Sequence, residues 1–320
     1  MNDTQTAAPR IISGDEKKKF SEVFKKDFNE NKVIYLMFLP IFVSIIIFQY
    51  LPMFGIVIAF QRYSPSSGFF GSEWVGLQYF KSFFNDFFFL RLIRNTFLLS
   101  LYSFLIGFPA PIILALLLNE IKFNKYKRVV QTVTYMPHFI AMTVIVGILR
   151  MMLKQDGVIN LIRSYFGLDS IIFLARAEYF RTILIASDVL QGVGYGSIVF
   201  LAAIASLGSE IYEAAYIDGA GRFKQCIHLT IPGILPTISY LMIFRLSGML
   251  SYSAGKIILL YNPAVYETGD VIGSYVYRKG ILEGAYSSSA AVGLFNSVVA
   301  LILLVTTNWV ARKLGEYSLW

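Results

Sequence analysis

The chain has 320 residues, of which 56% are hydrophobic and 15% are charged, and its formal net charge is +8. This composition, with a mean hydropathy of +0.61, is typical of an integral membrane protein and excludes an ordinary soluble domain. The basic excess does not indicate a nucleic-acid partner, because the Lys and Arg residues gather in the N-terminal tail and beside apolar runs. The single cysteine, Cys226, excludes an intrachain disulfide and a cysteine-based metal site.

Six apolar runs, each long enough to cross a bilayer as a helix, follow one another along the chain. They predict an all-α integral membrane protein with six transmembrane helices. A polar tail at 1–32 precedes the first span at 33–60, and an aromatic-rich extracytoplasmic loop at 61–94 follows it. A core of five further spans occupies 95–310, and a tail at 311–320 ends the chain. Within this core we place the spans at about 95–118, 129–153, 179–205, 237–260 and 287–310.

Basic residues orient these spans. The N-terminal tail, the loop at 119–128, the loop at 206–236 and the C-terminus together hold 15 of the 28 Lys and Arg residues, in dense clusters next to span ends. Such clusters stay on the cytoplasmic side of a membrane. We therefore expect both termini and the 206–236 loop to be cytoplasmic.

The loop at 206–236 is a long polar interruption between the fourth and fifth spans. Its pattern predicts a first helix capped by Ser209, a turn at Gly219, and a second short amphipathic helix that ends at Pro232 and Pro236. A helix, a turn and a helix held rigidly outside the bilayer suit docking to another protein.

The sequence carries no catalytic signature. It has two histidines and lacks a His-Glu-x-x-His motif, a Gly-x-Ser-x-Gly elbow and paired cysteines. It also lacks the Gly-x-x-x-x-Gly-Lys-Ser/Thr phosphate loop, so a protein of this kind that uses ATP must depend on a separate ATPase subunit. We expect no catalytic residue, no metal site and no cofactor bound by this chain.

Polar residues inside the predicted spans are costly in lipid and tend to face a cavity or another helix. On the fourth span three of them share one helical face, and on the fifth span Arg245, Met249, Tyr252 and Lys256 do the same. Tyrosines beside hydrogen-bonding groups suit sugars, which have apolar faces and hydroxyl edges. The candidates for a substrate pathway are Asp188, Gln191, Tyr195, Arg245, Tyr252 and Asn296.

These residues have an alternative interpretation as contacts between helices. In that interpretation Asp188 pairs with Arg245 between spans, and Gln191 and Asn296 make interhelical hydrogen bonds. Arg245 and Lys256 also have an alternative role as contacts for an acidic sugar.

The 206–236 loop resembles a known motif as well. Ten of its residues look like the EAA loop of ABC importer permeases: Glu213, Ala214, Ala215, Asp218, Gly219, Ala220, Phe223, Ile227, Pro232 and Pro236. In that family the loop is a coupling helix that sits in a groove of the cytoplasmic ATPase. The resemblance implies that these residues couple this chain to an ATPase, with Glu213 as a charged contact and Gly219 as the tight turn.

A narrower resemblance lies towards the C-terminus. The stretches 261–263, 270–272, 275–278 and 291–296 and the terminal Glu-Tyr-Ser-Leu-Trp are similar to the LplB-like branch of carbohydrate-uptake permeases, which is related to the maltose transporter's permeases. The similarity covers residues 30–320. One departure stands out, because this chain has Ser-Ala-Gly before Lys256 where that branch has Gly-Phe-Glu.

This resemblance implies a type I ABC importer permease, multi-pass in the cytoplasmic membrane of a bacterium and surrounded by lipid. The implied partners are a second homologous permease, a cytoplasmic ABC ATPase dimer that holds ATP and Mg, and an extracytoplasmic solute-binding protein. The implied substrate is an oligosaccharide, including polysaccharide-derived or acidic ones.

Three alternatives remain open at this point. An ABC permease for a non-sugar solute is the nearest of them. A stand-alone secondary transporter would need internal repeats, which the sequence does not show, and intramembrane charge pairs for an ion. A membrane scaffold without transport activity is the third.

Overall fold

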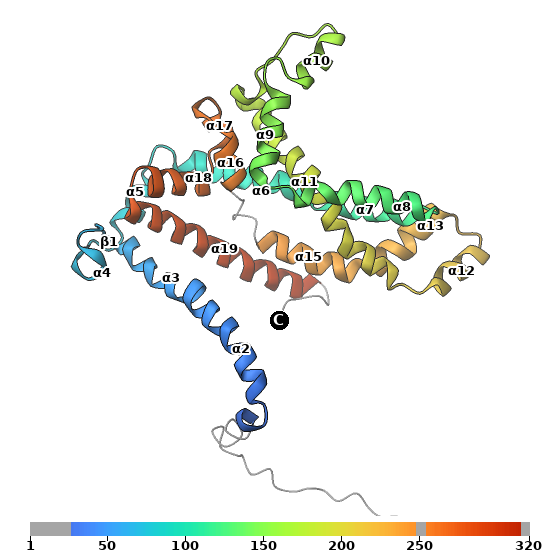
Figure 1. The fold of residues 1–320 in the computed structure, drawn as a ribbon, viewed down its shortest axis with the longest axis horizontal. Helices are drawn as coiled ribbons and strands as arrows, with labels where there is room; N and C mark the ends of the chain where they lie inside the picture. The colour runs from blue at the N-terminus through green and yellow to red at the C-terminus, as the bar shows by residue number, and fades with distance from the viewer. Residues whose placement is uncertain (1–26, 248–253, 315–320) are drawn as a thin grey trace, which may run out of the picture. The chain divides into compact units, whose positions relative to one another are not determined.

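The computed structural model describes residues 27–247 and 254–314. Most of the predicted tail at 1–32, the predicted pathway residue Tyr252 and its neighbour Met249 lie outside the described residues. The described chain is almost entirely helical, as the sequence predicts (Figure 1). It divides into two compact units, Met1–Ile56 and Val57–Trp320.

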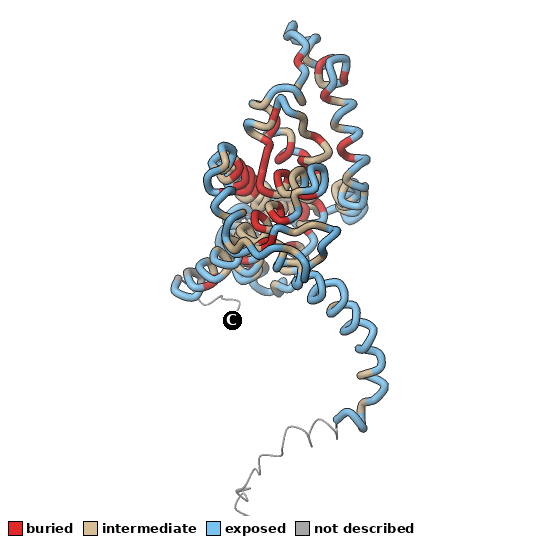
Figure 2. The backbone as a smooth tube through the Cα atoms, turned by 90° about the vertical axis from the view of Figure 1, so that its left-hand side faces the viewer, coloured by how far each residue is buried: buried red, intermediate tan, exposed pale blue. Residues whose placement is uncertain are grey.

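The apolar part of the N-terminal unit that the structure describes is one helical path, which contains two prolines. Helix α2 (Lys32–Ile45) runs into the π-helical segment η1 (Ile46–Tyr50) and then into α3 (Leu51–Met53). Pro52 has no N–H and its ring crowds the carbonyl four residues earlier, so the helix widens into the π turn just before it. No residue from Lys32 to Met53 is buried (Figure 2), which suits a helix surrounded by lipid.

Small elements open the larger unit. The 3₁₀ segment η2 (Phe54–Phe60) leads into it, and β1 (Gln61–Arg62) pairs antiparallel with β2 (Glu73–Trp74). This short ladder departs from the all-α prediction, and an ion pair of 3.0 Å between Arg62 and Glu73 lies across it. The helices that follow are α4 (Gly68–Gly71), α5 (Gln78–Phe84), α6 (Phe89–Gly107), α7 (Pro109–Glu120), α8 (Asn124–Tyr135), η3 (Met136–Phe139), α9 (Met142–Leu153), α10 (Val158–Tyr165) and η4 (Phe173–Ala175).

The rest of the larger unit is organised around α11 (Ala177–Ala205), a helix of 29 residues. It packs against α6, α7 and α8. The later elements are α12 (Ser209–Ile217), α13 (Arg222–Gln225), η5 (Cys226–Thr230), α14 (Ile231–Gly233), α15 (Leu235–Ser247), α16 (Ala254–Leu260), η6 (Pro263–Val265), α17 (Tyr266–Gly269), α18 (Ile272–Tyr277), η7 (Arg278–Leu282) and α19 (Tyr286–Leu314).

Four helical stretches among the described residues are long and apolar enough to cross a membrane: Lys32–Phe60, Phe89–Glu120, Ala177–Ala205 and Tyr286–Trp309. Two bent helix pairs bring the number to six if each pair crosses as one span. The sequence-based prediction of several membrane helices is therefore confirmed in outline, with up to six spans.

The third predicted span, 129–153, needs a correction, because it is not one continuous helix. Asn124–Phe139 and Met142–Tyr165 meet at an angle of 100°. Pro137 stands at the start of η3, and the two residues after η3, Ile140 and Ala141, have extended backbone angles. Pro137 supplies no N–H to the Val133 carbonyl, so the helix is weakened in the turn that precedes these extended residues. A second bend, of 59°, separates Arg222–Gly233 from Leu235–Leu246.

Three buried apolar clusters hold the larger unit together. The first joins Phe180 and Leu184, near the start of α11, to residues of α6, α9 and α16. The second joins Leu92 of α6 to α5, α18 and α19. The third packs Phe200 and Ile204, near the end of α11, against α7 and Ile234. Helix α11 therefore contributes to the core at both of its ends.

Candidate functional site

The polar loop at 206–236 forms a helix, a glycine turn and a second helix, as predicted. The predicted end of the second helix at Pro232 and Pro236 is wrong, because Pro232 lies inside α14 and Pro236 inside α15, and the helix is interrupted between them at Ile234. Helix α12 ends in a cap in which Gly219 has φ of +76°. The Gly219 N–H donates to the Tyr216 carbonyl at 3.0 Å, and the Ala220 N–H donates to the Ala215 carbonyl at 2.9 Å. This pattern is a Schellman cap, which glycine favours because an L side chain is strained at positive φ.

The predicted cap at the start of this helix is wrong. Ser209 is already the first helical residue, and its side chain makes no capping hydrogen bond. Gly208 precedes the helix with an extended backbone and occupies the boundary position instead. The serine hydroxyl is therefore one residue too late to accept from the free N–H groups of the first turn.

One contact braces the loop against the rest of the unit, and another joins its two helical segments. Arg222 of α13 forms an ion pair of 3.0 Å with Glu120, the last residue of α7. The Tyr212 hydroxyl of α12 lies 3.0 Å from the Thr230 hydroxyl of η5. Beyond Thr230 the helical path continues through α14 into α15, so a force on α12 passes to the core through short connections.

The same loop presents a groove and three exposed apolar side chains. Tyr216, Ile217 and Phe223 are 78%, 84% and 78% exposed. Large exposed apolar groups on a polar segment are typical of a surface that binds another protein. The groove has a volume of about 620 Å³ and is lined by Ser209, Tyr212, Glu213, Tyr216, Ile217, Gly219, Ala220, Gly221, Arg222 and Gln225.

The other residues predicted to couple to an ATPase lie at or beside this groove. Glu213, Ala214 and Asp218 are exposed, and Ala215 is half-buried. Two more, Pro232 and Pro236, are exposed and lie on either side of the 59° bend. The structure thus brings Glu213, Gly219 and Ala220 together in the lining of one groove, and the role of the EAA-like residues in coupling stays a prediction.

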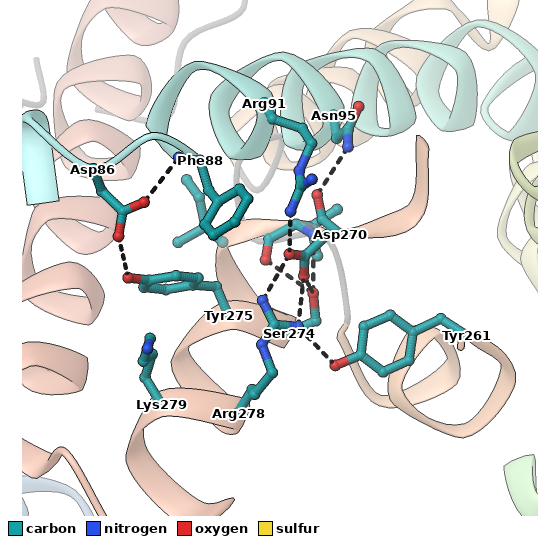
Figure 3. A network of polar contacts seen from close by, with 12 residues as sticks. Asp86, Phe88, Arg91, Asn95, Tyr261, Asp270, Ser274, Tyr275, Arg278 and Lys279 are labelled. Carbon is teal, nitrogen blue, oxygen red and sulfur yellow. Dashed lines mark hydrogen bonds and ion pairs between the residues drawn. The ribbon is translucent and has the colours of Figure 1, made fainter. Parts of the chain in front are cut away.

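A second polar site lies at the opposite end of α11, in stretches that the sequence marked by resemblance but for which it predicted no polar network (Figure 3). Asp270 is fully buried and accepts from both terminal nitrogens of Arg278, at 2.7 and 3.2 Å. Arg91 of α6 lies 3.5 Å from the same carboxylate, and the Ser274 hydroxyl donates to it at 2.8 Å. The Asn95 amide donates to the carbonyls of Glu267 and Asp270, at 2.9 and 3.0 Å.

This network ties the segment at 261–286 to α6 and α11. Arg181 of α11 donates to the Asn95 side chain at 2.7 Å and to the Thr268 carbonyl at 3.2 Å. Nearby, the Tyr275 hydroxyl donates to Asp86 at 2.8 Å, and burial together with this hydrogen bond raises the pKa of Tyr275. Spacing along the sequence could not reveal these contacts, because they join residues as far as 189 positions apart.

The predicted pathway residues of α11 fall into two contact groups. Lys256 of α16 contacts the Asp188 carboxylate and lies 3.3 Å from the Ser187 hydroxyl. The alternative pairing of Asp188 with Arg245 is therefore wrong. Arg245 instead donates to the Ser103 hydroxyl of α6 at 3.1 Å.

The second group faces the break between η3 and α9. Gln191 donates to the Ile140 carbonyl at 3.2 Å, so its partner lies in the extended break and not on another helix. The Tyr195 ring stacks on His138, with ring centres 4.0 Å apart and planes 3° from parallel. Phe139 meets the Tyr195 ring edge-on. Tyr195 remains 48% exposed in this chain.

Asn296 of α19 behaves differently from the other candidates. Its side-chain oxygen is buried and has no hydrogen-bond partner among the described residues. The expected interhelical hydrogen bond is therefore not made by the side-chain oxygen of Asn296 within the described residues. No group of three or more His, Cys, Asp or Glu residues within the described ranges is placed to hold a metal ion.

Comparisons with known proteins give concordant results. A family model described as binding-protein-dependent transport system inner membrane component matches residues 107–316. Protein LplB of Bacillus subtilis (strain 168) is 45% identical over 291 residues, which cover 90% of this chain and 91% of LplB. The polygalacturonan/rhamnogalacturonan transport system permease protein YteP of the same organism is 39% identical over 292 residues, or 91% of each chain.

Solved structures agree with these relatives. A chain from a bacterial ABC transporter involved in the import of the acidic polysaccharide alginate aligns with a TM-score of 0.85 and 40% identity. The alignment covers 92% of this chain and 100% of that one. A chain from a bacterial alginate ABC transporter in complex with an alginate pentasaccharide-bound periplasmic protein also aligns with a TM-score of 0.85, at 39% identity, covering 92% of this chain and 99% of that one.

Proposed function

This chain belongs to the binding-protein-dependent transport system inner membrane component family, and we propose that it is a permease subunit of an ATP-driven importer of oligosaccharides. It is a transport subunit, and not an enzyme. The names of its relatives support sugars as the substrate class, and two of them point to acidic, polysaccharide-derived oligosaccharides.

The observation that carries the proposal is the braced helix, turn and helix at 209–233. Its exposed groove and apolar side chains suit a protein partner, and its ion pair to α7 and its continuity with α11 and α15 suit the transfer of force. The partner is a cytoplasmic ABC ATPase dimer, which supplies ATP and Mg. Both termini and this loop lie on the cytoplasmic side of the cytoplasmic membrane of a bacterium.

Alternating access follows from this arrangement. Closure of the ATPase dimer on ATP pulls α12, and the path through Pro232 and Pro236 passes the motion to α11 and α15. The pathway between this chain and a second, homologous permease then faces outward, and hydrolysis returns it inward. Asp188, Gln191, Tyr195, Arg245, Tyr252 and Asn296 are the proposed contributors of this chain to the pathway.

The face opposite the coupling loop receives the substrate. In the alginate transporter, a periplasmic protein that holds an alginate pentasaccharide is part of the complex. By analogy, an extracytoplasmic solute-binding protein docks on this chain at the end of α11 where the Asp270 network holds the 261–286 segment. That network gives the outer segment a fixed shape for docking.

A matched pair of substitutions tests the coupling role. Gly219→Asp places a side chain where φ is +76°, which strains the cap between α12 and α13. Gly208→Asp adds the same charge outside the groove lining, at the residue before α12, where φ is −60° and Asp is a favoured N-cap. We expect both variants to reach the membrane, and only Gly219→Asp to lose ATP-driven uptake.

Uptake is measured in vesicles that contain the complete importer. Normal uptake by Gly219→Asp would contradict the proposed role of this loop in coupling to the ATPase. Purification of the chain from native membranes without any ATPase, together with uptake in vesicles that lack one, would favour a secondary transporter instead. Recovery of a second permease and an ATPase is the expected result.

A further inference from the structure

A second groove lies at the start of α6, beside the Asp270 network and away from the coupling loop. Its volume is about 290 Å³, and it is lined by Phe87, Phe88, Leu90, Arg91, Arg94 and Glu267. Two cations and three large apolar side chains thus line one small groove. This composition suits a ligand that has both an anionic group and an apolar part.

Both arginines keep hydrogen-bonding capacity for a ligand. Arg91 lies 3.5 Å from Asp270, a carboxylate that Arg278 already holds through two shorter hydrogen bonds (Figure 3). The Nε atom of Arg91 is buried and has no hydrogen-bond partner among the described residues. Arg94 is exposed, and it forms no ion pair with any residue that the structure describes. Most of the five donors of each guanidinium are therefore unused.

The face of α6 that carries Arg94 is otherwise apolar. Leu90, Phe97 and Leu105 are exposed, and helical spacing puts them on the same face as Arg94. The buried residues of α6 lie on the opposite face: Leu92, Asn95, Thr96, Leu99, Ser100 and Ser103. Since Phe89–Glu120 is long and apolar enough to cross a membrane, an exposed apolar stripe on it suits contact with lipid. Arg94 is the charged residue on this stripe.

The position of Arg94 favours a lipid over a soluble anion. It lies five residues after Phe89, where α6 begins, which is about 7 Å along the helix axis. An arginine near the end of a membrane helix extends its side chain to the headgroup level, and a guanidinium binds phosphate through two parallel hydrogen bonds. A soluble anion would match the arginines but leave Phe87 and Leu90, which are 90% and 77% exposed, without cover.

We propose that this groove binds the headgroup phosphate of a phospholipid in the leaflet opposite the coupling loop. Arg94 and Arg91 donate to the phosphate, and Phe87 and Leu90 contact the apolar part of the lipid. Glu267 is the acidic residue of the lining, and its charge interacts with Arg181 of α11, which limits its repulsion of the phosphate. The bound lipid holds the start of α6 in place. This inference goes beyond the proposed function and does not depend on which solute is transported.

Native mass spectrometry of the complete importer, with both permeases and the ATPase, measures this binding. The probes are phosphatidylglycerol and a diglucosyl diacylglycerol with the same acyl chains, which lacks phosphate. We expect the wild type to bind phosphatidylglycerol about tenfold or more tightly than the glycolipid, because hydrogen bonds to the phosphate are charge-assisted. Arg94→Gln should remove this preference. Arg176→Gln removes the same charge from an exposed residue outside the groove, just before α11, and should keep it.

The wild type alone already puts the proposal at risk, since equal affinity for the two lipids would overturn it even if no variant assembled. Arg94→Gln with an undiminished preference would overturn it as well. Phosphatidylglycerol should raise the thermal midpoint of the wild-type complex and inorganic phosphate should not; equal shifts would mean a simple anion site. An intact lipid preference in Arg94→Gln, combined with weaker binding of the solute-binding protein or of a galacturonate oligomer, would assign the groove to that soluble partner instead.

Discussion

The three glycines at 192, 194 and 196 in α11 allow a sharp test of how closely this helix packs. A Cβ atom built on Gly194 lies 1.9 Å from the Thr134 carbonyl oxygen and 2.4 Å from its carbon. Both atoms are backbone atoms of α8 and cannot swing aside. A Cβ atom on Gly192, in the same helix, has no heavy atom within 4 Å. The two positions therefore have the same secondary structure but differ in the free room around an added side chain.

The expected effects of alanine have opposite signs. At Gly192, alanine reduces the flexibility of the unfolded chain and should raise the free energy of unfolding by about 0.5–1 kcal/mol. At Gly194 a steric cost exceeds that gain in free energy. The added Cβ would lie only 1.9 Å from the Thr134 carbonyl oxygen, so α8 must move by more than about 1 Å to restore an ordinary contact distance. Overpacking of this kind costs about 1–3 kcal/mol or more.

The assay is the thermal midpoint of the purified importer in detergent, with all variants heated at one rate because unfolding of such complexes is irreversible. Gly192→Ala should match or exceed the wild type, and Gly194→Ala should melt several degrees lower. Equal midpoints would refute the close approach of α8 and α11. Gly194→Ala should also reduce uptake, because Thr134 lies one turn before His138, which stacks on Tyr195.

Three further predictions concern the coupling loop at 206–236 and the polar network around Asp270. Phe223→Ala should leave the thermal midpoint of the chain unchanged, because this ring is 78% exposed. It should weaken ATPase binding by about 1–2 kcal/mol, measured by ATPase retention on immobilised permease, and full retention would contradict the docking role. Asp270→Asn should destabilise the chain by about 3–5 kcal/mol, because Arg278 and Arg91 lose a fully buried counter-charge; a normal midpoint would contradict this. Tyr275 stays protonated in the folded chain above its ordinary pKa of 10.0, so stability should fall as the pH rises above that value, and the fall should be smaller in Tyr275→Phe, measured by alkaline unfolding.

Much of the coupling loop was readable from the sequence because its signals are local. The end of α12 depends on Gly219 and the carbonyls within five residues of it, and a glycine after an amphipathic run is enough to indicate that turn. The start of the same helix was misplaced by one residue, because Ser209 and Gly208 are both acceptable at a helix boundary. Local preference alone could not choose between them.

The partners of the buried charges were not readable in this way. Arg245 and Lys256 both follow the helical spacing of the fifth span, so either of them was a reasonable partner for Asp188. Which of the two pairs with Asp188 depends on how α15 and α16 are rotated and placed against α6 and α11. That placement is set by contacts between residues far apart in the sequence. The break at Ile140 and Ala141 likewise brings backbone carbonyls to Gln191, and only the packed helices reveal that contact.

By itself, the sequence determined that this chain is a helical membrane protein with a polar docking loop. The signals for these features are local, because the length of an apolar run and the positions of proline and glycine affect only the backbone close to them. The tertiary structure decided which charges meet, where the third span breaks, and that Asp270 anchors the segment opposite the coupling loop. The physical reason is that a buried charge must find a counter-charge wherever packing places one. That position is set by the whole arrangement of helices rather than by neighbours in the chain.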